Sequence, residues 1–222
     1  MQEQEHLGDK NQSHVVQIMT TEHYNLQSAR SLATSEAAGR SSLFLSTVSI
    51  GLVALALVGQ ASALGRAFFV FALVLFPSLF FLGLVTFQRT FQIDLEDFIY
   101  MRGINRIRHL YIEIAPQVQD YFVLSTHDDE ASIWQDMEYQ AVWWQYFVST
   151  PGMIGMIDSI LAGTFAGLLV YQLFSLSLLL CCTMGLVVFL GILVALYRSS
   201  LKRWKRFQRS VKPLFPTPVQ VE

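Results

Sequence analysis

Charged side chains are scarce in this sequence. Asp, Glu, Lys and Arg make up 14% of the 222 residues, against about 25% in an ordinary soluble domain. The deficit falls in three runs without any charge, at residues 41–65, 67–88 and 159–197. A charge-free apolar run of about 18 residues or more is typical of a transmembrane helix, because the hydrocarbon core is about 30 Å thick and a helix rises about 1.5 Å per residue.

The third run is too long for one span. As a single helix, residues 159–197 would extend about 58 Å, roughly twice the thickness of the hydrocarbon core, so the run must fold back on itself. The sequence therefore predicts an all-α, polytopic membrane protein. Four transmembrane helices form two hairpins, and helical extensions of these spans reach into the cytoplasm.

Cysteine is also scarce, and motifs of catalytic chemistry are missing. The two cysteines, Cys181 and Cys182, are neighbours inside the last apolar run, where two thiols provide too few ligands for a metal. We interpret them as small packing residues. The five histidines show no ligand spacing, and neither a glycine-rich phosphate loop nor a Ser/His/Asp set stands out. We expect no catalytic residue, cofactor or metal site, and therefore no enzyme.

One acidic cluster raises the question of a metal. Residues 127–130 read His-Asp-Asp-Glu, and carboxylates with an imidazole suit several divalent cations. The same order also suits a helix start, where Thr126 caps the first turn and the carboxylates face the positive end of the helix dipole. We favour the helix start.

The basic residues predict the orientation. Lys and Arg in short flanks of the spans mark the cytoplasmic side. Residues 198–212 hold seven of them, and four arginines follow the second span, whereas the two predicted hairpin turns hold only Arg66. Both termini and the central segment are therefore expected in the cytoplasm of a cell whose inner (plasma) membrane holds the protein.

These predictions divide the chain into five segments. A cytoplasmic N-terminal segment with a helix from about Tyr24 precedes the first hairpin, and a central helical segment separates the two hairpins. A basic cytoplasmic tail follows the last span. The segments are residues 1–40, 41–88, 89–152, 153–197 and 198–222.

Small residues recur along the third span. Four of them follow one another at four-residue intervals, so they share one face of the helix. Such a stripe lets helices approach closely in lipid, where dispersion contacts replace the hydrophobic driving force. We predict a helix-packing seam made by Gly155, Ser159, Gly163 and Gly167.

Asp158 is the ionisable residue that this architecture does not explain. It lies just inside the third span, and intramembrane carboxylates usually face a protein interior or a water-filled path. Asp158 is then a candidate pore or polar site, with Arg89 at the end of the second span as its nearest candidate partner. The competing interpretation places Asp158 at the cytoplasmic interface.

The tail after the fourth span combines basic and aromatic residues, as some nucleic-acid-binding segments do. Directly after a span, attraction to anionic inner-leaflet lipids explains it better, at about 1 kcal/mol per basic residue. We expect lipid headgroup contacts and no nucleic acid. The predicted contacts are Arg198, Lys202, Arg203, Lys205, Arg206 and Arg209.

The segments 24–27, 30–36 and 40–44 together resemble the opening of a family of uncharacterised bacterial four-span membrane proteins. The resemblance covers most of residues 24–125. It implies a bacterial inner-membrane location and no particular activity. The central positions that carry it are Asp97, Tyr100, Ile104, Arg106, Ile107 and Arg108.

Two hypotheses about function remain. The expected hairpin turns leave almost no external surface, so function must lie in the bilayer or on the cytoplasmic helices. The first hypothesis is a homo-oligomeric channel for ions or small solutes, although the spans offer few polar groups to line a pore. The alternative is a non-conducting scaffold or signalling effector that binds a cytoplasmic protein partner.

Overall fold

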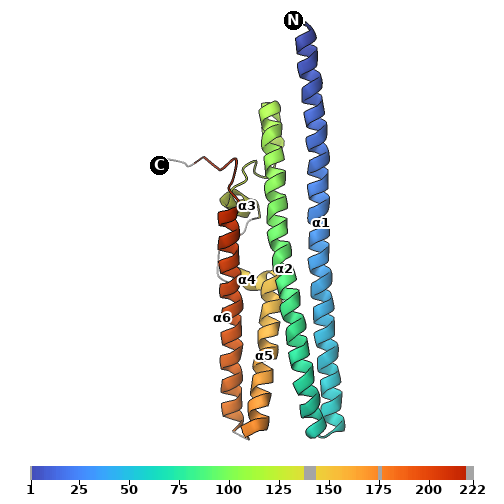
Figure 1. Ribbon diagram of the computed structural model, residues 1–222, viewed down its shortest axis with the longest axis vertical. Helices are drawn as coiled ribbons and strands as arrows, with labels where there is room; N and C mark the ends of the chain where they lie inside the picture. Colours follow the sequence, from blue (N-terminus) through green and yellow to red (C-terminus); the bar gives the residue numbers. More distant parts are fainter. Residues whose placement is uncertain (1, 138–143, 175–176, 219–222) are drawn as a thin grey trace. The chain divides into compact units, whose positions relative to one another are not determined.

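The computed structural model describes residues 2–137, 144–174 and 177–218, with the side chains of residues 2–10 left out. All regular structure in this part of the chain is helical (Figure 1). Its elements, in chain order, are α1 (Gln2–Ala61), α2 (Arg66–Ile114), the 3-10 helix η1 (Pro116–Tyr121), α3 (Glu130–Asp136), α4 (Gln145–Val148), α5 (Thr150–Phe174) and α6 (Leu178–Ser210).

Four of these helices, α1, α2, α5 and α6, are long and apolar enough to cross a membrane. The prediction of an all-helical chain with four helices able to cross a membrane is thereby confirmed. The chain divides into two compact units. We call residues 36–93 and 142–205 the membrane unit, and residues 1–35, 94–141 and 206–222 the polar unit.

In the membrane unit, α1 and α2 are connected by a tight turn (Figure 1). Ala63 and Leu64 adopt positive φ angles of 47° and 57° there, a conformation that residues other than glycine seldom adopt. The two helices pack closely beyond the turn, because a Cβ atom at Gly51 would lie 3.2 Å from methyl carbons of Leu75 and Leu79. The core of this unit is built by buried aromatic and aliphatic side chains, among them Phe44, Phe76, Phe87, Ile154 and Leu161.

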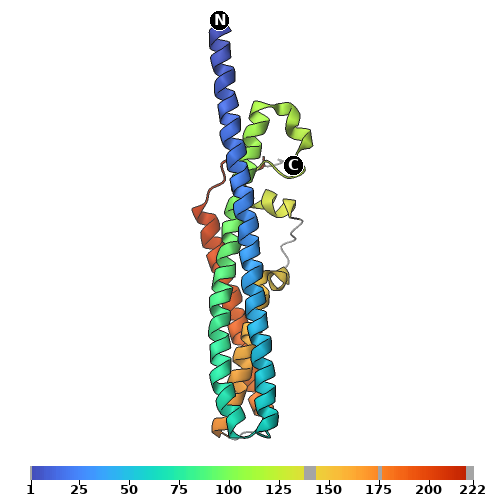
Figure 2. The ribbon, with the colours of Figure 1, turned by 90° about the vertical axis from the view of Figure 1, so that its right-hand side faces the viewer.

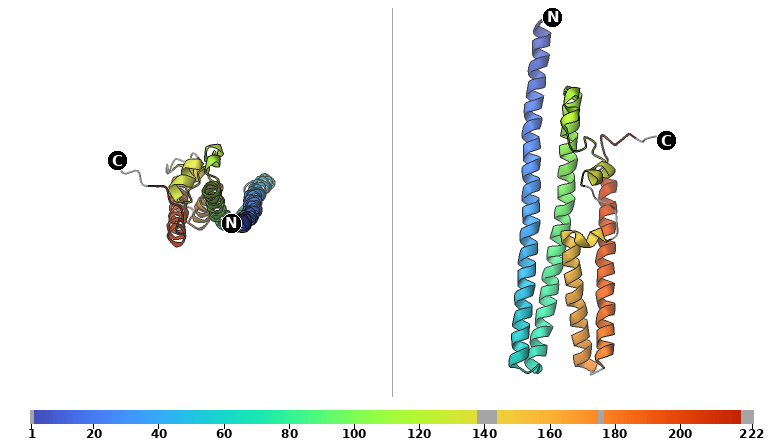
Figure 3. Two further views of the ribbon diagram at one scale, coloured as in Figure 1. Left: turned by 90° about the horizontal axis from the view of Figure 1, so that it is seen from above. Right: turned by 180° about the vertical axis from the view of Figure 1, so that it is seen from behind.

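Helices α5 and α6 lie side by side in the same unit (Figure 3). They approach closely at Gly163, where a Cβ atom would lie 2.7 Å from the carbonyl oxygen of Gly185. Helix α6 does not end with the apolar run at Tyr197 but continues to Ser210. Part of the predicted basic tail is therefore helical.

In the polar unit, the chain turns back after α2 through η1 towards the short helix α3 (Figure 2). Phe98 is fully buried there and contacts the rings of Trp134 and Phe207. Ile104 and Ile133 are buried as well. The unit thus has a small apolar core of its own.

Two local predictions were wrong. Helix α1 begins at Gln2 and not near Tyr24. Helix α3 is capped by Asp129, whose carboxylate accepts a hydrogen bond from the Ser132 backbone N–H, and not by Thr126.

Candidate functional site

Asp158 lies in the interior of the membrane unit. Its exposed fraction is 0%, and neither carboxylate oxygen has a hydrogen-bond partner. One of these oxygens lies against the backbone of Gly83 in α2, where a Cβ atom would be only 2.0 Å away. The same Cβ atom would lie 3.1 Å from the ring of Phe44, so the carboxylate occupies a tight and apolar place between helices.

Arg89 does not provide the partner that the sequence suggested. Its guanidinium donates to both oxygens of Glu36, at 2.9 Å from Nε and 2.8 Å from Nη2. Glu36 also accepts from Arg40 at 2.8 Å. The hydrogen bonds from Arg89 and then Arg40 lower the pKa of Glu36 to about 2. The prediction of an Arg89–Asp158 pair was therefore wrong, and Asp158 is buried among protein side chains.

The small residues of α5 pack inside the chain. Gly163 and Gly167 face Gly185 and Cys181 of α6. Gly155 faces Phe87 and Leu196, and the Ser159 hydroxyl donates to the carbonyl oxygen of Gly155 at 2.7 Å. This seam is a contact within the subunit.

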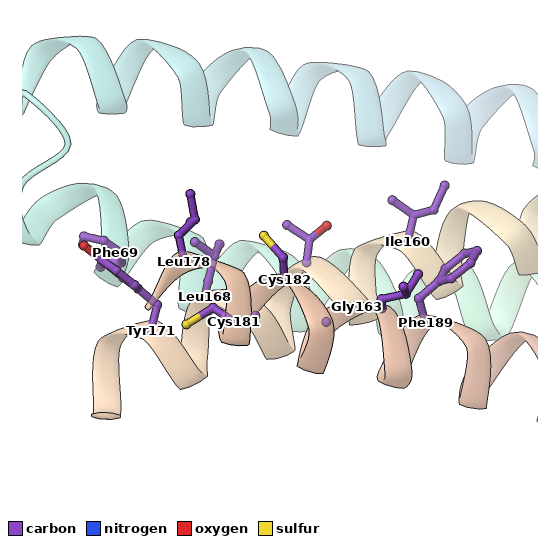
Figure 4. A pocket seen from close by; sticks show the side chains of 13 residues that line it. Phe69, Ile160, Gly163, Leu168, Tyr171, Leu178, Cys181, Cys182 and Phe189 are labelled. Atoms are coloured by element: carbon purple, nitrogen blue, oxygen red, sulfur yellow. The ribbon is translucent and has the colours of Figure 1, made fainter. Parts of the chain in front are cut away.

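A groove of about 740 Å³ runs along the same helices (Figure 4). Phe69 of α2 and Tyr171 of α5 lie near one end, and Phe189 of α6 lies near the other. Most of its remaining lining consists of glycine, cysteine and aliphatic side chains. This surface suits hydrocarbon and not a polar solute.

The exposed faces of α1 and α6 differ in chemistry. In the apolar part of α1, four polar residues lie within one stripe of the helix, opposite the face that packs in the core. They are Ser42, Ser46, Ser49 and Gln60, and all are exposed. Helix α6 exposes mainly aliphatic side chains, including Leu178, Leu179, Leu186 and Val187, while α1 also exposes aliphatic side chains beside its polar residues, such as Ile50 and Val53.

The polar unit contains a second fully buried carboxylate, which holds the C-terminal segment. Asp128 is 0% exposed. It accepts hydrogen bonds from the backbone N–H groups of Leu214 at 3.0 Å and Phe215 at 2.7 Å, and from Nε of Arg106 at 2.7 Å. Its own backbone N–H donates to the Phe215 carbonyl oxygen at 3.1 Å.

Asp129 extends this attachment. Its carboxylate accepts from both the backbone N–H and the hydroxyl of Thr217, at 3.0 and 2.8 Å. Phe215 stacks on the ring of His109, with 3.9 Å between the ring centroids. We call Arg106, His109, Asp128 and Asp129, together with the residues 214–217 that they hold, the C-terminal clasp.

The clasp keeps both carboxylates ionised. Burial by itself would raise the pKa of Asp128, but the hydrogen bonds from Leu214, Phe215 and Arg106 outweigh it and hold the pKa below its usual value. At Asp129, burial again acts to raise the pKa, but hydrogen bonds from Ser132 and Thr217 outweigh it and lower the pKa to about 2. Reasoning from sequence assigned the acidic cluster to a helix start and did not predict that it holds residues 214–217. Two signals were available: the surplus of acidic residues in the central segment beside a basic tail, and the three prolines after Lys212, which favour an extended segment.

The predicted lipid-contact residues fall into two groups. In the membrane unit, Arg203 bonds to Gln88 and lies over the Phe91 ring, 6.0 Å from its centroid. The other predicted residues are exposed, each within its own unit: Arg198, Lys202, Lys205, Arg206 and Arg209.

Among the residues that the structure describes, no group of three or more His, Cys, Asp or Glu side chains is arranged to hold a metal ion. Comparison of the chain with models of protein families, with curated protein sequences and with solved structures finds no match.

Proposed function

We propose that the chain is the subunit of a homo-oligomeric membrane channel for ions or small solutes, and that the exposed polar stripe of α1 lines its path. The observation that carries the proposal is the placement of Ser42, Ser46, Ser49 and Gln60 on the outer face of that helix. Hydroxyl and amide groups gain nothing from contact with lipid tails, whereas neighbouring subunits or water satisfy them. Around a symmetry axis, this face would turn inward.

Asp158 has a different role in this proposal from the one that its position in the sequence suggested. A carboxylate ring at a pore mouth needs side chains that reach water, and Asp158 is 0% exposed in the subunit. We assign it to the packing of α5 against Gly83 of α2, where its carboxylate fills the space between the helices.

The orientation is part of the proposal. Both termini and the polar unit lie in the cytoplasm of a bacterial cell, the spans cross its inner membrane, and the exposed basic residues nearest the spans contact anionic lipids. Reporter fusions at Gln2 and Glu222 test the orientation. Both should report a cytoplasmic location, and a periplasmic signal from either would contradict it.

Cysteine accessibility tests the path itself. In a variant with Cys181 and Cys182 replaced by Ala, Ser46→Cys and Ser49→Cys should react quickly with a charged, water-soluble thiol reagent, because only an ionised thiol in water is reactive. The matched control is Val187→Cys on α6, whose native side chain is 63% exposed and would face lipid. Modification should also block current in bilayer recordings. Equally slow reaction at all three positions would refute a wet path along α1.

The polar unit gives a reason to retain the scaffold as a second proposal. It exposes large side chains, with Tyr121 at 82% and Val123 at 97%. Such side chains suit the apolar centre of a protein interface. If the channel test fails, Val123→Asp should abolish recruitment of a cytoplasmic protein in cross-linking experiments while leaving membrane insertion intact.

A further inference from the structure

The polar unit contains a cavity of about 150 Å³ that is separate from the C-terminal clasp. Two guanidinium groups, Arg30 and Arg108, line it together with one carboxylate, Asp136. The remaining lining is mainly apolar: Met101, Ile104, Leu124, Ile133 and Met137, with the amide of Asn105.

Arg108 is a partly buried cation without an ion-pair partner. Its Nη1 donates to Oδ1 of Asn105 at 2.8 Å, and within the described ranges no ion pair forms at its guanidinium. Burial lowers the pKa of Arg108; Asp136 opposes this change and Arg30 adds to it. Asp136 is the counter-charge within the lining, but it forms no ion pair with Arg108, so the partly buried guanidinium has N–H groups that an added anion would satisfy.

The other charged groups of the cavity are already engaged. Arg30 donates from Nε to Asp97 at 2.8 Å, an ion pair that leaves its remaining N–H groups available. Both oxygens of Asp136 accept from the Ser125 backbone N–H, at 2.9 and 3.0 Å. Asp97 offsets the charge of Arg30 and Asp136 opposes that of Arg108, so a bound anion would gain from the guanidinium N–H groups of both arginines and not from a net positive charge.

We propose that this cavity binds a small organic carboxylate. The carboxylate group would accept hydrogen bonds from Arg30 and Arg108, since guanidinium groups match the geometry of carboxylates. The apolar body would lie against Met101, Ile104 and Ile133. At about 30 Å³ per water-sized group, the cavity accommodates roughly five non-hydrogen atoms, which is the size of a short-chain acid. Inorganic phosphate fits less well, because an apolar wall and the carboxylate of Asp136 would face its remaining oxygens.

The test uses the full-length protein purified in detergent and isothermal titration with sodium butyrate. Sodium chloride and inorganic phosphate serve as the comparison anions. Butyrate should bind saturably, and Arg108→Met should weaken this binding at least tenfold. The matched control is Arg209→Met, which removes an exposed arginine outside the cavity and should leave the affinity unchanged.

Two further variants test the cavity if Arg108→Met does not fold. Arg108→Lys retains the charge and should bind more weakly than the wild type but measurably. Leu124→Trp fills the cavity without removing a charge and should abolish binding. The proposal is overturned if butyrate does not bind the wild type, if phosphate or chloride competes equally well, or if Leu124→Trp binds normally. None of these outcomes depends on whether the protein conducts.

Discussion

Each of the two units contains a fully buried aspartate, and the two carboxylates differ in their hydrogen bonding. Asp128 in the polar unit and Asp158 in the membrane unit are both 0% exposed. Asp128 accepts hydrogen bonds from two backbone N–H groups and one guanidinium, while neither oxygen of Asp158 has a partner. Burial alone therefore does not say what a carboxylate does.

The difference follows from what surrounds each residue. A loop segment such as 214–217 has free backbone N–H groups to offer, because it forms no helix of its own. Helices around Asp158 use their N–H groups internally, so a carboxylate between them finds no donor unless a side chain provides one. Asp128 therefore fixes a tail, whereas Asp158 is an unsatisfied group of the kind that marks a functional or strained position.

The largest effect should come from Asp128→Ala. Removing one partner of a buried ion pair costs about 3–5 kcal/mol, and a value near 3 kcal/mol is expected because Arg106 remains one-third exposed. The tail should detach, seen as fast hydrogen exchange over residues 211–217. Asp120→Ala, which removes an exposed carboxylate, is the control and should change neither quantity.

Acid should reproduce part of this effect. The pKa values of Asp128 and Asp129 are lower in the folded protein than in the unfolded chain, so their contribution to stability is complete above about pH 4. It is lost as the pH falls through the folded values, of which that of Asp129 is about 2. A spin label at Pro218→Cys, with Cys181 and Cys182 replaced, should become mobile between about pH 4 and pH 2. Release already at pH 6 would contradict this assignment.

A moderate effect is expected from Gly83→Ala. The added Cβ would lie 2.0 Å from the Asp158 carboxylate, and overpacking of this kind costs about 1–3 kcal/mol. Thermal unfolding in detergent measures it. Combining Gly83→Ala with Asp158→Ala should restore most of the loss, while Gly191→Ala on α6, where nothing lies within 4 Å, should not destabilise. If the double variant were as unstable as Gly83→Ala alone, the added Cβ atom would not clash with Asp158.

The smallest effect is expected from Asp158→Asn. No hydrogen bond is lost because neither oxygen has a partner, so the free energy of unfolding should change by less than about 1 kcal/mol. Asp128→Asn should be clearly destabilising. Measuring both Asn variants therefore tests directly whether the two buried carboxylates differ in their hydrogen bonding. If Asp158→Asn were as harmful as Asp128→Asn, a partner for Asp158 would have to exist.

Several features of the fold follow from local sequence. The three charge-free runs predicted four helices able to cross a membrane, and the expected helical extension of the second span corresponds to α2, which continues to Ile114. These predictions succeed because hydrophobic length and internal hydrogen bonding are properties of a single segment in lipid. The cap of α3 was predicted at Thr126 instead of Asp129, since several residues near a helix start are able to cap it.

Tertiary structure alone decided the partners of the charged residues. Spacing along the chain shows which side chains share a helix face, but not how each helix is rotated against its neighbours. Glu36 and not Asp158 therefore meets Arg89, and Asp158 meets the bare backbone at Gly83. The clasp depends on the same information, because the tail reaches Asp128 from 86 or 87 residues further along the chain, a distance over which no sequence pattern specifies contact.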